Sequence, residues 1–369
     1  MYQRRLWVLL HRWISIVILL FVVVAGLTGS AIAFWRNIDA YLNPSWYSVE
    51  VNGVSRTYAE LSADVIRQYP ESRIHGIVLP NDRASSVIIY LAEETTGLDE
   101  IFINPYSGDI LGARSNDQIS FDRQHLMPLL YRVHYSLAAG GIGEVVLGVA
   151  ALLWLMVTLI GLWLAWPKRG KWHKALSVKT SAGLPRLMFD LHRAVGLLFG
   201  GLFLVIIWTG LWWNMNYAIR PVVSSLLPTT PWFVDTLPEQ TTQSIIGPDE
   251  AIALALAERP EAKAYYLRSI SDKSVHIIYL RQPGEAEPYG RTFVFVSFDG
   301  TILNIDEPAK NLVGDSYSEW QLSLHTGQFL GFSGRLLWAF SGLLPALLAV
   351  TGLVLWTRRR NLARVRQRR

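Results

Sequence analysis

Eight histidines occur in the 369-residue chain, and four of them lie at positions that recur. His11 and His192 each stand in a Leu-His-Arg triplet, while His134 and His325 each precede glycines and a long apolar segment. Two neutral imidazoles can hold one haem iron in a low-spin, six-coordinate state that suits electron transfer rather than oxygen binding. The pattern predicts two haems b, one with His11 and His192 as axial ligands and one with His134 and His325.

The other four histidines, His75, His125, His173 and His276, have no counterpart in the other half of the chain. His125 is the best spare candidate ligand, whereas His75 and His276 are expected to face solvent or a core. A single histidine near the end of an apolar segment is commonly an interfacial residue. The ligand interpretation therefore depends on the repetition, which can also preserve a residue for packing.

One arginine directly follows each histidine of the Leu-His-Arg triplets. Arg12 and Arg193 could bind haem propionates, since guanidinium groups pair with carboxylates in a bidentate manner; alternatively, they serve only to orient the spans. Glycines could give a haem ring the room it needs between helices, or could simply pack helices closely. The glycines in question are Gly26, Gly29, Gly196, Gly200 and Gly210.

The spacing around the histidines is the same in both halves of the chain. A Thr-Gly pair begins 17 residues after one histidine, and a distal glycine follows 27 residues after the other. The matched positions are His11 and Thr28, His192 and Thr209, His134 and Gly161, and His325 and Gly352. We predict a tandem duplication of a span–domain–span unit, with both copies in the same orientation about an axis along the membrane normal. Such an axis brings equivalent histidines together.

Four segments are long and apolar enough to cross a membrane, which takes about 20 residues. They contain no charged residue and lie between Arg12 and Arg36, Glu144 and Lys168, Arg193 and Arg220, and Arg335 and Arg358. His134 lies ten residues before Glu144, so it is expected on a short helix that folds back toward the bilayer, and the same holds for His325. The start of the chain also resembles a signal peptide with a site at Ala31-Ile32-Ala33, but the duplication requires this segment as a helix.

Basic residues gather at the ends of these spans on one side. They are Arg4, Arg5, Arg12, Lys168, Arg169, Lys171, Lys174, Lys179, Arg186, Arg193, Arg358, Arg359, Arg360, Arg364, Arg366, Arg368 and Arg369, against the single acid Asp190. By the positive-inside rule both termini and the link are cytoplasmic in a bacterial inner membrane. The net charge of +5 therefore indicates an inside-basic membrane protein with lipid as a partner, and no nucleic acid.

The two long external segments each predict a small periplasmic α+β domain. Each has a helical stretch, 58–68 and 248–257, an alternating strand, 86–91 and 276–280, and a strand–Gly turn–strand unit, 102–111 and 296–303. The predicted boundaries are 1–36 for span one, 37–133 for the first domain, 134–167 for a lead-in and span two, 168–188 for the cytoplasmic link, 189–219 for span three, 220–324 for the second domain, 325–357 for a lead-in and span four, and 358–369 for the tail.

Several other chemistries are excluded or lack a motif. The chain has no cysteine, which excludes disulfides, cysteine-ligated clusters and covalently attached c-type haem. Dinucleotide, P-loop, zinc-protease and nucleophile-elbow motifs do not occur. The cytoplasmic link is too short for a flavin or NAD domain. Electrons that enter from inside must therefore come from a separate donor, either membrane quinol or a cytosolic reductase.

The His-Arg starts of spans one and three and the strand–Gly turn–strand units resemble the PepSY-associated transmembrane family, over about Leu6 to Trp356. The external segments are similar to PepSY domains, which makes the predicted fold class a four-helix membrane protein with two α+β PepSY-like domains. Members of this family include FoxB-type ferric-siderophore reductases. The resemblance implies haem b bound by histidines and one-electron reduction of a ferric siderophore, which releases Fe(II).

Three alternatives remain open from the sequence. One is a siderophore transporter, against which the absence of acidic residues from the four spans and the short cytoplasmic link argue. The other two are as follows. The first is a haem b oxidoreductase for another periplasmic acceptor, which would use the same histidines. The second is a non-enzymatic membrane module whose PepSY-like domains bind a partner or regulate a protease, with structural histidines. Aromatic side chains near the external mouth could contact a ligand, although interface anchoring explains them equally well; they are Trp46, Tyr135, Trp232 and Trp320.

Overall fold

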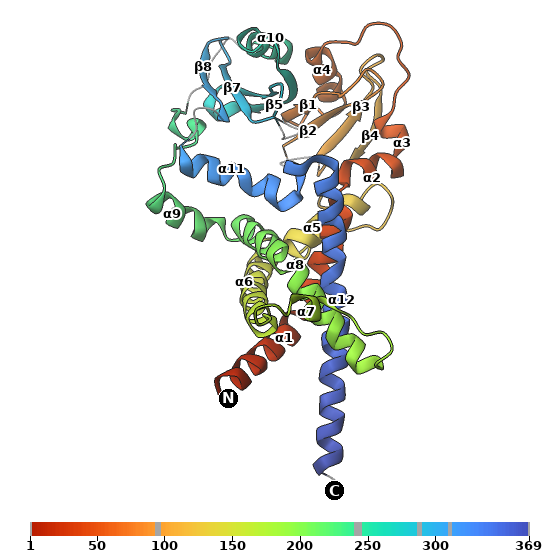
Figure 1. Cartoon of the computed structure of the whole chain (residues 1–369). Helices are drawn as coiled ribbons and strands as arrows, with labels where there is room; N and C mark the ends of the chain where they lie inside the picture. The colour runs from red at the N-terminus through yellow and green to blue at the C-terminus, as the bar shows by residue number, and fades with distance from the viewer. Residues whose placement is uncertain (1, 93–96, 240–245, 286–289, 309–311, 368–369) are drawn as a thin grey trace. The chain divides into compact units, whose positions relative to one another are not determined.

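The computed structural model describes residues 2–92, 97–239, 246–285, 290–308 and 312–367 (Figure 1). The chain forms two compact units. The first unit, here called the helical unit, contains Met1–Phe34, Leu130–Val222 and Trp320–Arg369, and the second, the sheet unit, contains Trp35–Leu129 and Val223–Glu319.

Within the described residues, four helices of the helical unit are long and apolar enough to span a membrane. They are α1 (Tyr2–Ile32), α6 (Gly140–Ala165), α8 (Leu184–Asn214) and α12 (Gly331–Gln367). The four predicted spans are therefore confirmed. Helix α1 packs against α6 and α12, and α8 packs against the same two helices, so each half of the chain contributes two adjacent spans.

Glycines let two of these helices approach closely, which is typical of membrane bundles. A Cβ atom at Gly26 of α1 would lie 2.5 Å from the carbonyl oxygen of Gly342 in α12. Nearby, the hydroxyl of Ser30 donates to the carbonyl of Ala339 at 2.7 Å. Gly200 packs against Leu162. Gly26 and Gly200, predicted to border a haem, thus pack helices together, while a Cβ atom at Gly196 would meet nothing within 4 Å.

Short helices lead into two of the spans. They are α5 (Leu126–Ser136) before α6 and α11 (Val313–Thr326) before α12. Gly140 and Gly331, at the starts of the spans, have φ angles of 57° and 62°, which glycine adopts without strain. A Cβ atom at Gly143 would overlap the carbonyl of Ser136, and one at Gly334 would lie 2.1 Å from that of Gly327. The chain therefore turns tightly between each short helix and its span. The other helices of this region are α7 (Trp172–Leu176), α9 (Asn216–Leu226) and the 3-10 turn η4 (Gln328–Leu330).

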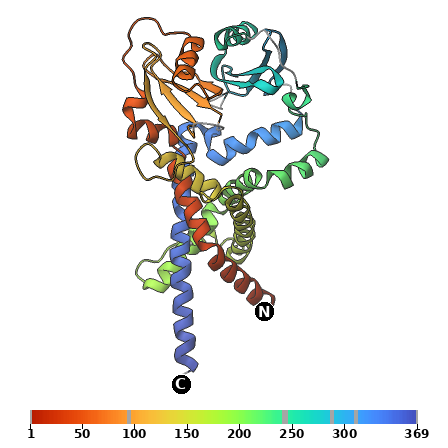
Figure 2. The same cartoon turned by 180° about the vertical axis from the view of Figure 1, so that it is seen from behind.

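The sheet unit contains one antiparallel sheet in the order β4-β3-β2-β1-β5-β6-β7-β8. Its strands are β1 (Ile74–Val78), β2 (Val87–Leu91), β3 (Glu100–Ile103), β4 (Ile110–Arg114), β5 (Lys263–Ile270), β6 (Val275–Arg281), β7 (Thr292–Ser297) and β8 (Ile302–Asp306). Helices α4 (Tyr58–Gln68) and α10 (Pro248–Glu258) pack on one face and lie side by side in both views (Figures 1 and 2). The remaining helical pieces are α2 (Trp35–Leu42), α3 (Pro44–Tyr47), η1 (Phe233–Thr236) and η2 (Ser271–Lys273).

The two halves of the sheet unit were predicted as separate domains, and here the structure differs. Strands β1 and β5 pair with each other, with Gly76 opposite Arg268 and Val78 opposite Tyr266. These are the two strands that the sequence pattern does not predict. The carboxylate of Asp249 in α10 also accepts hydrogen bonds from the backbone N–H groups of Tyr58 and Ala59 at the start of α4. The halves therefore share one sheet and one helical layer.

A buried ionic cluster fixes the start of the sheet unit. The guanidinium of Arg114 donates to both Asp39 and Glu100, and all three side chains are almost completely buried. Arg36 donates to the hydroxyl of Tyr90 at 2.6 Å. Hydrogen bonds and the two carboxylates raise the pKa of Arg114 despite its burial. The cluster joins α2 to strands β2, β3 and β4.

Candidate cofactor site

The histidines of the helical unit meet in two pairs. His11 of α1 and His192 of α8, the first pair, have ring centres 6.2 Å apart and nearly perpendicular ring planes at 86°. His134 of α5 and His325 of α11, the second pair, have ring centres 6.1 Å apart and planes at 51°. Both pairs are the ones that the duplication predicts. That they bind iron stays a prediction.

Hydrogen bonds determine which ring nitrogen carries the proton in the first pair. Nδ1 of His11 lies 3.1 Å from the carbonyl oxygen of Val157, which can only accept, so Nδ1 is the donor. Nδ1 of His192 lies 2.9 Å from the hydroxyl oxygen of Thr351. This hydroxyl already donates to the carbonyl of Leu347 at 2.8 Å and therefore accepts from His192. Each Nε2 keeps its lone pair.

The second pair follows the same rule with more partners. Nδ1 of His134 lies 3.0 Å from the carbonyl oxygen of Ala25 and 3.2 Å from the hydroxyl of Thr28. Nδ1 of His325 lies 3.2 Å from the carbonyl oxygen of Ile206 and 3.0 Å from the hydroxyl of Thr209. Both hydroxyls donate to carbonyls of their own helices, so they accept from the rings. A metal-binding histidine is usually held in this way, by its other N–H group.

The ring separation matches what a shared metal requires. With a metal–nitrogen bond of about 2 Å on each side and ~1 Å from nitrogen to ring centre, two opposed imidazoles have centres about 6 Å apart. The donor set of each pair therefore fits bis-imidazole ligation of one haem iron.

Each histidine ring lies over a glycine of a neighbouring helix. A Cβ atom would come within 2.9 Å of the ring at Gly161, beneath His11, and at Gly29, beneath His134. The corresponding distances are 3.3 Å at Gly210 and 3.5 Å at Gly352. Gly29 and Gly210, predicted to make room for a haem ring, thus make room for a histidine ring; that they border a haem stays a prediction. Gly161 and Gly352 were recognised in the sequence only as repeated positions. The signal was that each lies 27 residues after a histidine, His134 or His325.

The two pairs lie at different depths of the helical unit. His11 contacts α6 near one end of α1, whereas His134 contacts Thr28 near the other end. The 17 residues from His11 to Thr28 correspond to about 25 Å at the helical rise of about 1.5 Å per residue. This distance is most of the thickness of a hydrocarbon core, about 30 Å, so the pairs lie near opposite ends of the long apolar helices.

The two arginines beside the first pair have different surroundings. Nε of Arg12 is buried and has no hydrogen-bond partner within the described residues. The guanidinium of Arg193, in contrast, donates to the carboxylate of Asp190 at 3.0 Å and to the carbonyl of Ala175 at 2.8 Å. Arg12 therefore fits its predicted role as a propionate partner. The donors of Arg193 hold α7 and the buried Asp190, so its propionate role stays a prediction without such support.

The other histidines lie apart from the pairs. His276 is buried in β6 against Phe298, and burial lowers its pKa. His125 bonds to Asp122 at 2.8 Å, and hydrogen bonds from Ser120 and His125 lower the pKa of Asp122 to about 2. Within the described residues, no group of three or more acidic, histidine or cysteine side chains could hold a metal ion. The paired histidines are therefore the strongest cofactor site.

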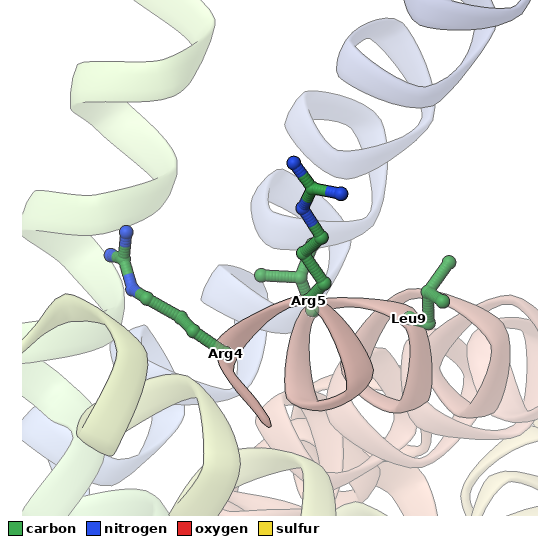
Figure 3. A pocket seen from close by; sticks show the side chains of 4 residues that line it. Arg4, Arg5 and Leu9 are labelled. Carbon is green, nitrogen blue, oxygen red and sulfur yellow. The ribbon is translucent and has the colours of Figure 1, made fainter. Parts of the chain in front are cut away.

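A basic hollow of about 470 Å³ adjoins the beginning of α1. Arg4, Arg5, Val8 and Leu9 line it, and Figure 3 shows both guanidinium groups projecting from the first turns of the helix. Arg4 also donates to the carbonyl of Leu164 in α6. None of the paired histidines lines this hollow. Two arginines over apolar side chains are the surface that a lipid headgroup and acyl chain would meet.

Comparison with known proteins places this chain in a family. The family model described as the PepSY-associated TM region matches residues 8–359. The chain therefore belongs to the PepSY-associated transmembrane family, in agreement with the resemblance of its motifs. No curated protein matches the chain.

Proposed function

From this family membership, we propose that the chain is a di-haem b electron-transfer protein of the bacterial inner membrane that reduces ferric siderophores. The observation that carries the proposal is the pairing of four histidines, each with Nδ1–H hydrogen-bonded and, among the residues that the structure describes, no protein partner for Nε2. Bound between two neutral imidazoles, haem b supplies a low-spin iron that gains and loses one electron. Two such sites near opposite membrane faces suit transfer of electrons across the bilayer.

The residues of the chain would hold and orient the cofactor. Carbonyl and threonine acceptors keep each ring in the tautomer that presents Nε2, and the glycines beneath the rings allow the Cε1 atom of each ring to approach a helix closely. Arg12 would bind a propionate through its guanidinium, whose Nε has no hydrogen-bond partner within the described residues. The apolar side chains of the four spans would exclude water from the haem slots.

The proposed topology rests on the charges and on the matched contacts of the two halves. Both termini and the link between α6 and α8 would be cytoplasmic, because the basic residues gather there. The sheet unit would then be periplasmic. Equivalent glycines underlie equivalent histidines, and Gly140 and Gly331 make the same turn, which supports a tandem duplication of a span–PepSY–span unit.

The proposed reaction transfers one electron to a ferric siderophore. Fe(III) becomes Fe(II), and the siderophore's hydroxamate or catecholate oxygens, which are hard ligands, bind Fe(II) far less tightly. Reduction at the periplasmic side therefore releases the metal. The electrons would come from membrane quinol or a cytosolic reductase, since the described residues form no flavin or nicotinamide domain.

The deciding experiment is the visible spectrum of the detergent-purified protein, oxidised and reduced, with a pyridine haemochrome count. We expect a low-spin b-type spectrum and about two haems per chain, because each pair supplies a full set of two axial ligands. The reduced protein should then be reoxidised by ferric siderophores under anaerobic conditions. A variant with alanine at both His134 and His325 is the control, since it should keep the haem of the first pair.

Two outcomes would contradict the proposal. A colourless protein from haem-replete cells would favour the non-enzymatic PepSY module. A haem protein that ferric siderophores do not reoxidise would favour electron transfer to another periplasmic acceptor.

A further inference from the structure

One face of the sheet is not covered by α4 and α10. Along β2, Val87, Ile89 and Leu91 pack beneath α4, so the alternate residue Tyr90 points to the opposite face. By the same alternation Tyr266 of β5 and Tyr279 of β6 lie on that face, because their neighbours join the core under α10. The centre of this face thus carries tyrosines in place of aliphatic side chains.

The tyrosine rings form a continuous row across strands from both halves of the chain. The ring centres of Tyr90 and Tyr266 are 6.1 Å apart, and those of Tyr266 and Tyr279 are 5.1 Å apart. The row continues to Phe293 of β7, 4.8 Å from Tyr279. All these pairs are close to edge-to-face, the arrangement that aromatic rings prefer. The row crosses the β1–β5 junction, where the two halves meet.

The backbone at this junction is irregular in a way that makes room for the row. The pairing register shifts between Ile74 and Gly76 on β1, and between Ala264 and Tyr266 on β5. Bulges of this kind re-aim side chains and are common next to binding sites. A Cβ atom at Gly76 would lie 2.2 Å from the hydroxyl oxygen of Tyr266. Gly76 therefore forms a notch that lets the Tyr266 ring lie across β1.

Two polar groups at this notch have no hydrogen-bond partner among the residues that the structure describes. Nε of Arg268, opposite Gly76 in the register, is buried and unpaired, although the same guanidinium hydrogen-bonds to Tyr279. No protein group bonds to the hydroxyl of Tyr266 within the same described ranges. An unpaired buried polar atom costs free energy unless a ligand or water satisfies it. The two groups therefore point to a ligand that accepts hydrogen bonds.

The charge of this face is positive. Arg36 is matched by Glu100, and Arg114 is matched by Asp39, within the buried ionic cluster. No acidic side chain pairs with Arg268 among the described residues. The phenols add neutral donors, since burial raises the pKa of Tyr90 to about 12 and also raises that of Tyr266. The hydroxyl of Tyr90 is already bonded to Arg36 and Glu100, and that of Tyr279 to Arg268. At neutral pH the row therefore offers the protonated hydroxyl of Tyr266 beside one cation, Arg268, that no acid balances within the described residues.

A tryptophan packs against an aromatic ring near each end of the tyrosine row. Trp46 of α3 packs on Phe102 of β3, with ring centres 5.2 Å apart. At the other end Trp232 packs on Phe293, with ring centres 5.7 Å apart. Between these tryptophans, strands β2, β1 and β5 present the partly buried Tyr90 and Tyr266. The row therefore lies between two tryptophans, and at the Trp232 end Tyr279 and Phe293 also pack against the core cluster around Val234 of η1.

We infer that this tyrosine face, defined by Tyr90, Tyr266, Arg268 and Tyr279 around Gly76, binds an anionic ferric chelate with aromatic rings, the catecholate class. The inference rests on the proposed function for the role of that ligand as substrate. Catecholate complexes of Fe(III) carry negative charge and expose aromatic edges, which suits edge-to-face tyrosines and a guanidinium that has an unpartnered Nε and no acidic partner within the described residues. Hydroxamate complexes have no rings and no such charge, so they match the face poorly.

The test is equilibrium binding of radiolabelled iron chelates to the full-length purified protein by ultrafiltration. The probes are the tris complexes of Fe(III) with 2,3-dihydroxybenzoate and with acetohydroxamate. We expect the catecholate complex to bind at least about tenfold more tightly. Arg268→Gln should weaken its binding about tenfold, because one charge-assisted hydrogen bond is lost, and Tyr266→Phe should weaken it a fewfold. Arg67→Gln, on exposed α4 over the opposite face, is the matched control and should bind as the wild type does.

The outcomes separate this inference from the proposed function. Equal binding of the two complexes, or unchanged binding by both Arg268→Gln and Tyr266→Phe, would overturn the inference even if the protein contains two haems and reduces ferric chelates. A colourless protein that still binds the catecholate complex through Arg268 would uphold the binding face and overturn the reductase. Unchanged haem spectra in both variants would show that weaker binding does not come from misfolding.

Discussion

The two histidine pairs have nearly the same ring separation, 6.2 and 6.1 Å, but they reach it in different ways. The first pair lies on continuous spans, α1 and α8. The second pair lies on the short helices α5 and α11, and tight turns return the chain to the spans. The two pairs therefore keep the same ring separation on different supporting structures, as expected if a shared ligand sets the separation.

The hydrogen-bond acceptors differ as well. In three of the four histidine contacts a Thr-Gly pair supplies both the acceptor and the glycine beneath the ring, at 28–29, 209–210 and 351–352. Beside His11 the corresponding pair is Ile160-Gly161, and only the carbonyl of Val157 accepts from the ring. The hydrogen-bond acceptors of the first pair therefore differ between its two histidines, whereas those of the second pair are of the same kind for both.

The largest expected effect is the loss of haem when one histidine of a pair is replaced. Alanine at His11 or His192 should remove the haem of the first pair, and alanine at His134 or His325 should remove that of the second, because one imidazole cannot keep a six-coordinate iron. The pyridine haemochrome count should fall from about two to about one per chain in each variant. His173→Ala, at an exposed position outside both pairs, should keep both haems. Full haem content in all four pair variants would disprove the pairing.

A second prediction concerns the glycines that lie against the histidine rings of the two pairs. Gly29→Ala and Gly161→Ala would place a Cβ atom 2.9 Å from the ring of His134 and His11, which must tilt the ring. We expect at least about a twofold loss of haem at the affected pair, since overpacking forces side chains off their positions. Gly352→Ala, with 3.5 Å available, should be nearly silent. The measurement is haem content per chain in purified protein.

Gly201→Ala is the control for this series, because a Cβ atom there would meet nothing within 4 Å. If Gly29→Ala and Gly161→Ala behave like Gly201→Ala, the rings do not depend on the glycines beneath them.

A third prediction separates the two arginines of the first pair. Arg193→Gln removes one of the two guanidinium partners of Asp190, which is completely buried. Because a buried carboxylate is left with fewer partners, the free energy of unfolding should fall by about 1–3 kcal/mol. Arg12→Gln should leave the apparent melting temperature nearly unchanged but weaken haem retention, measured by transfer of haem to apomyoglobin. The reverse result, with haem loss only in Arg193→Gln, would exclude the propionate role of Arg12.

Much of this arrangement could be predicted because its signals are local. Apolar runs without charge mark the spans, and a duplicated pattern brings equivalent residues such as His11 and His192 together about an axis. Thr28 and Thr209 were visible as repeated positions 17 residues after a histidine. Their role as acceptors for the other pair of histidines was not visible, because it depends on how α5 and α11 fold back.

Other features depend on long-range pairing and could not be predicted. The junction of β1 and β5 joins Gly76 to Arg268, almost 200 positions along the chain, and neither strand has a clear alternating pattern. For this reason the sequence predicted two separate domains where the structure has one eight-stranded sheet. Likewise, Asp190 was recognised as the only acid on its side, but its contact with Arg193 follows from helix packing at the link.

The smallest expected effect tests the asymmetry of the first pair. A hydrogen bond from Nδ1–H to an acceptor makes the imidazole a stronger donor to iron and favours the ferric state. Thr351→Val should therefore raise the potential of the first-pair haem, and Ile160→Thr should lower it. Each shift should be a few tens of mV, below the ~59 mV that corresponds to a tenfold change for one electron. Potentiometric titration followed in the visible spectrum measures both.

Matched substitutions make this test specific to one pair. Thr28→Val and Thr209→Val should raise the potential of the second-pair haem and leave the first unchanged, because the only paired histidines that their hydroxyls contact within the described residues are His134 and His325. Thr357→Val is the control, since its hydroxyl bonds only within α12. If Thr351→Val shifts the second-pair haem, or shifts nothing while Thr28→Val does, the threonine contact of His192 does not set the potential. The difference between the pairs would then have to arise from the arginines and their charges.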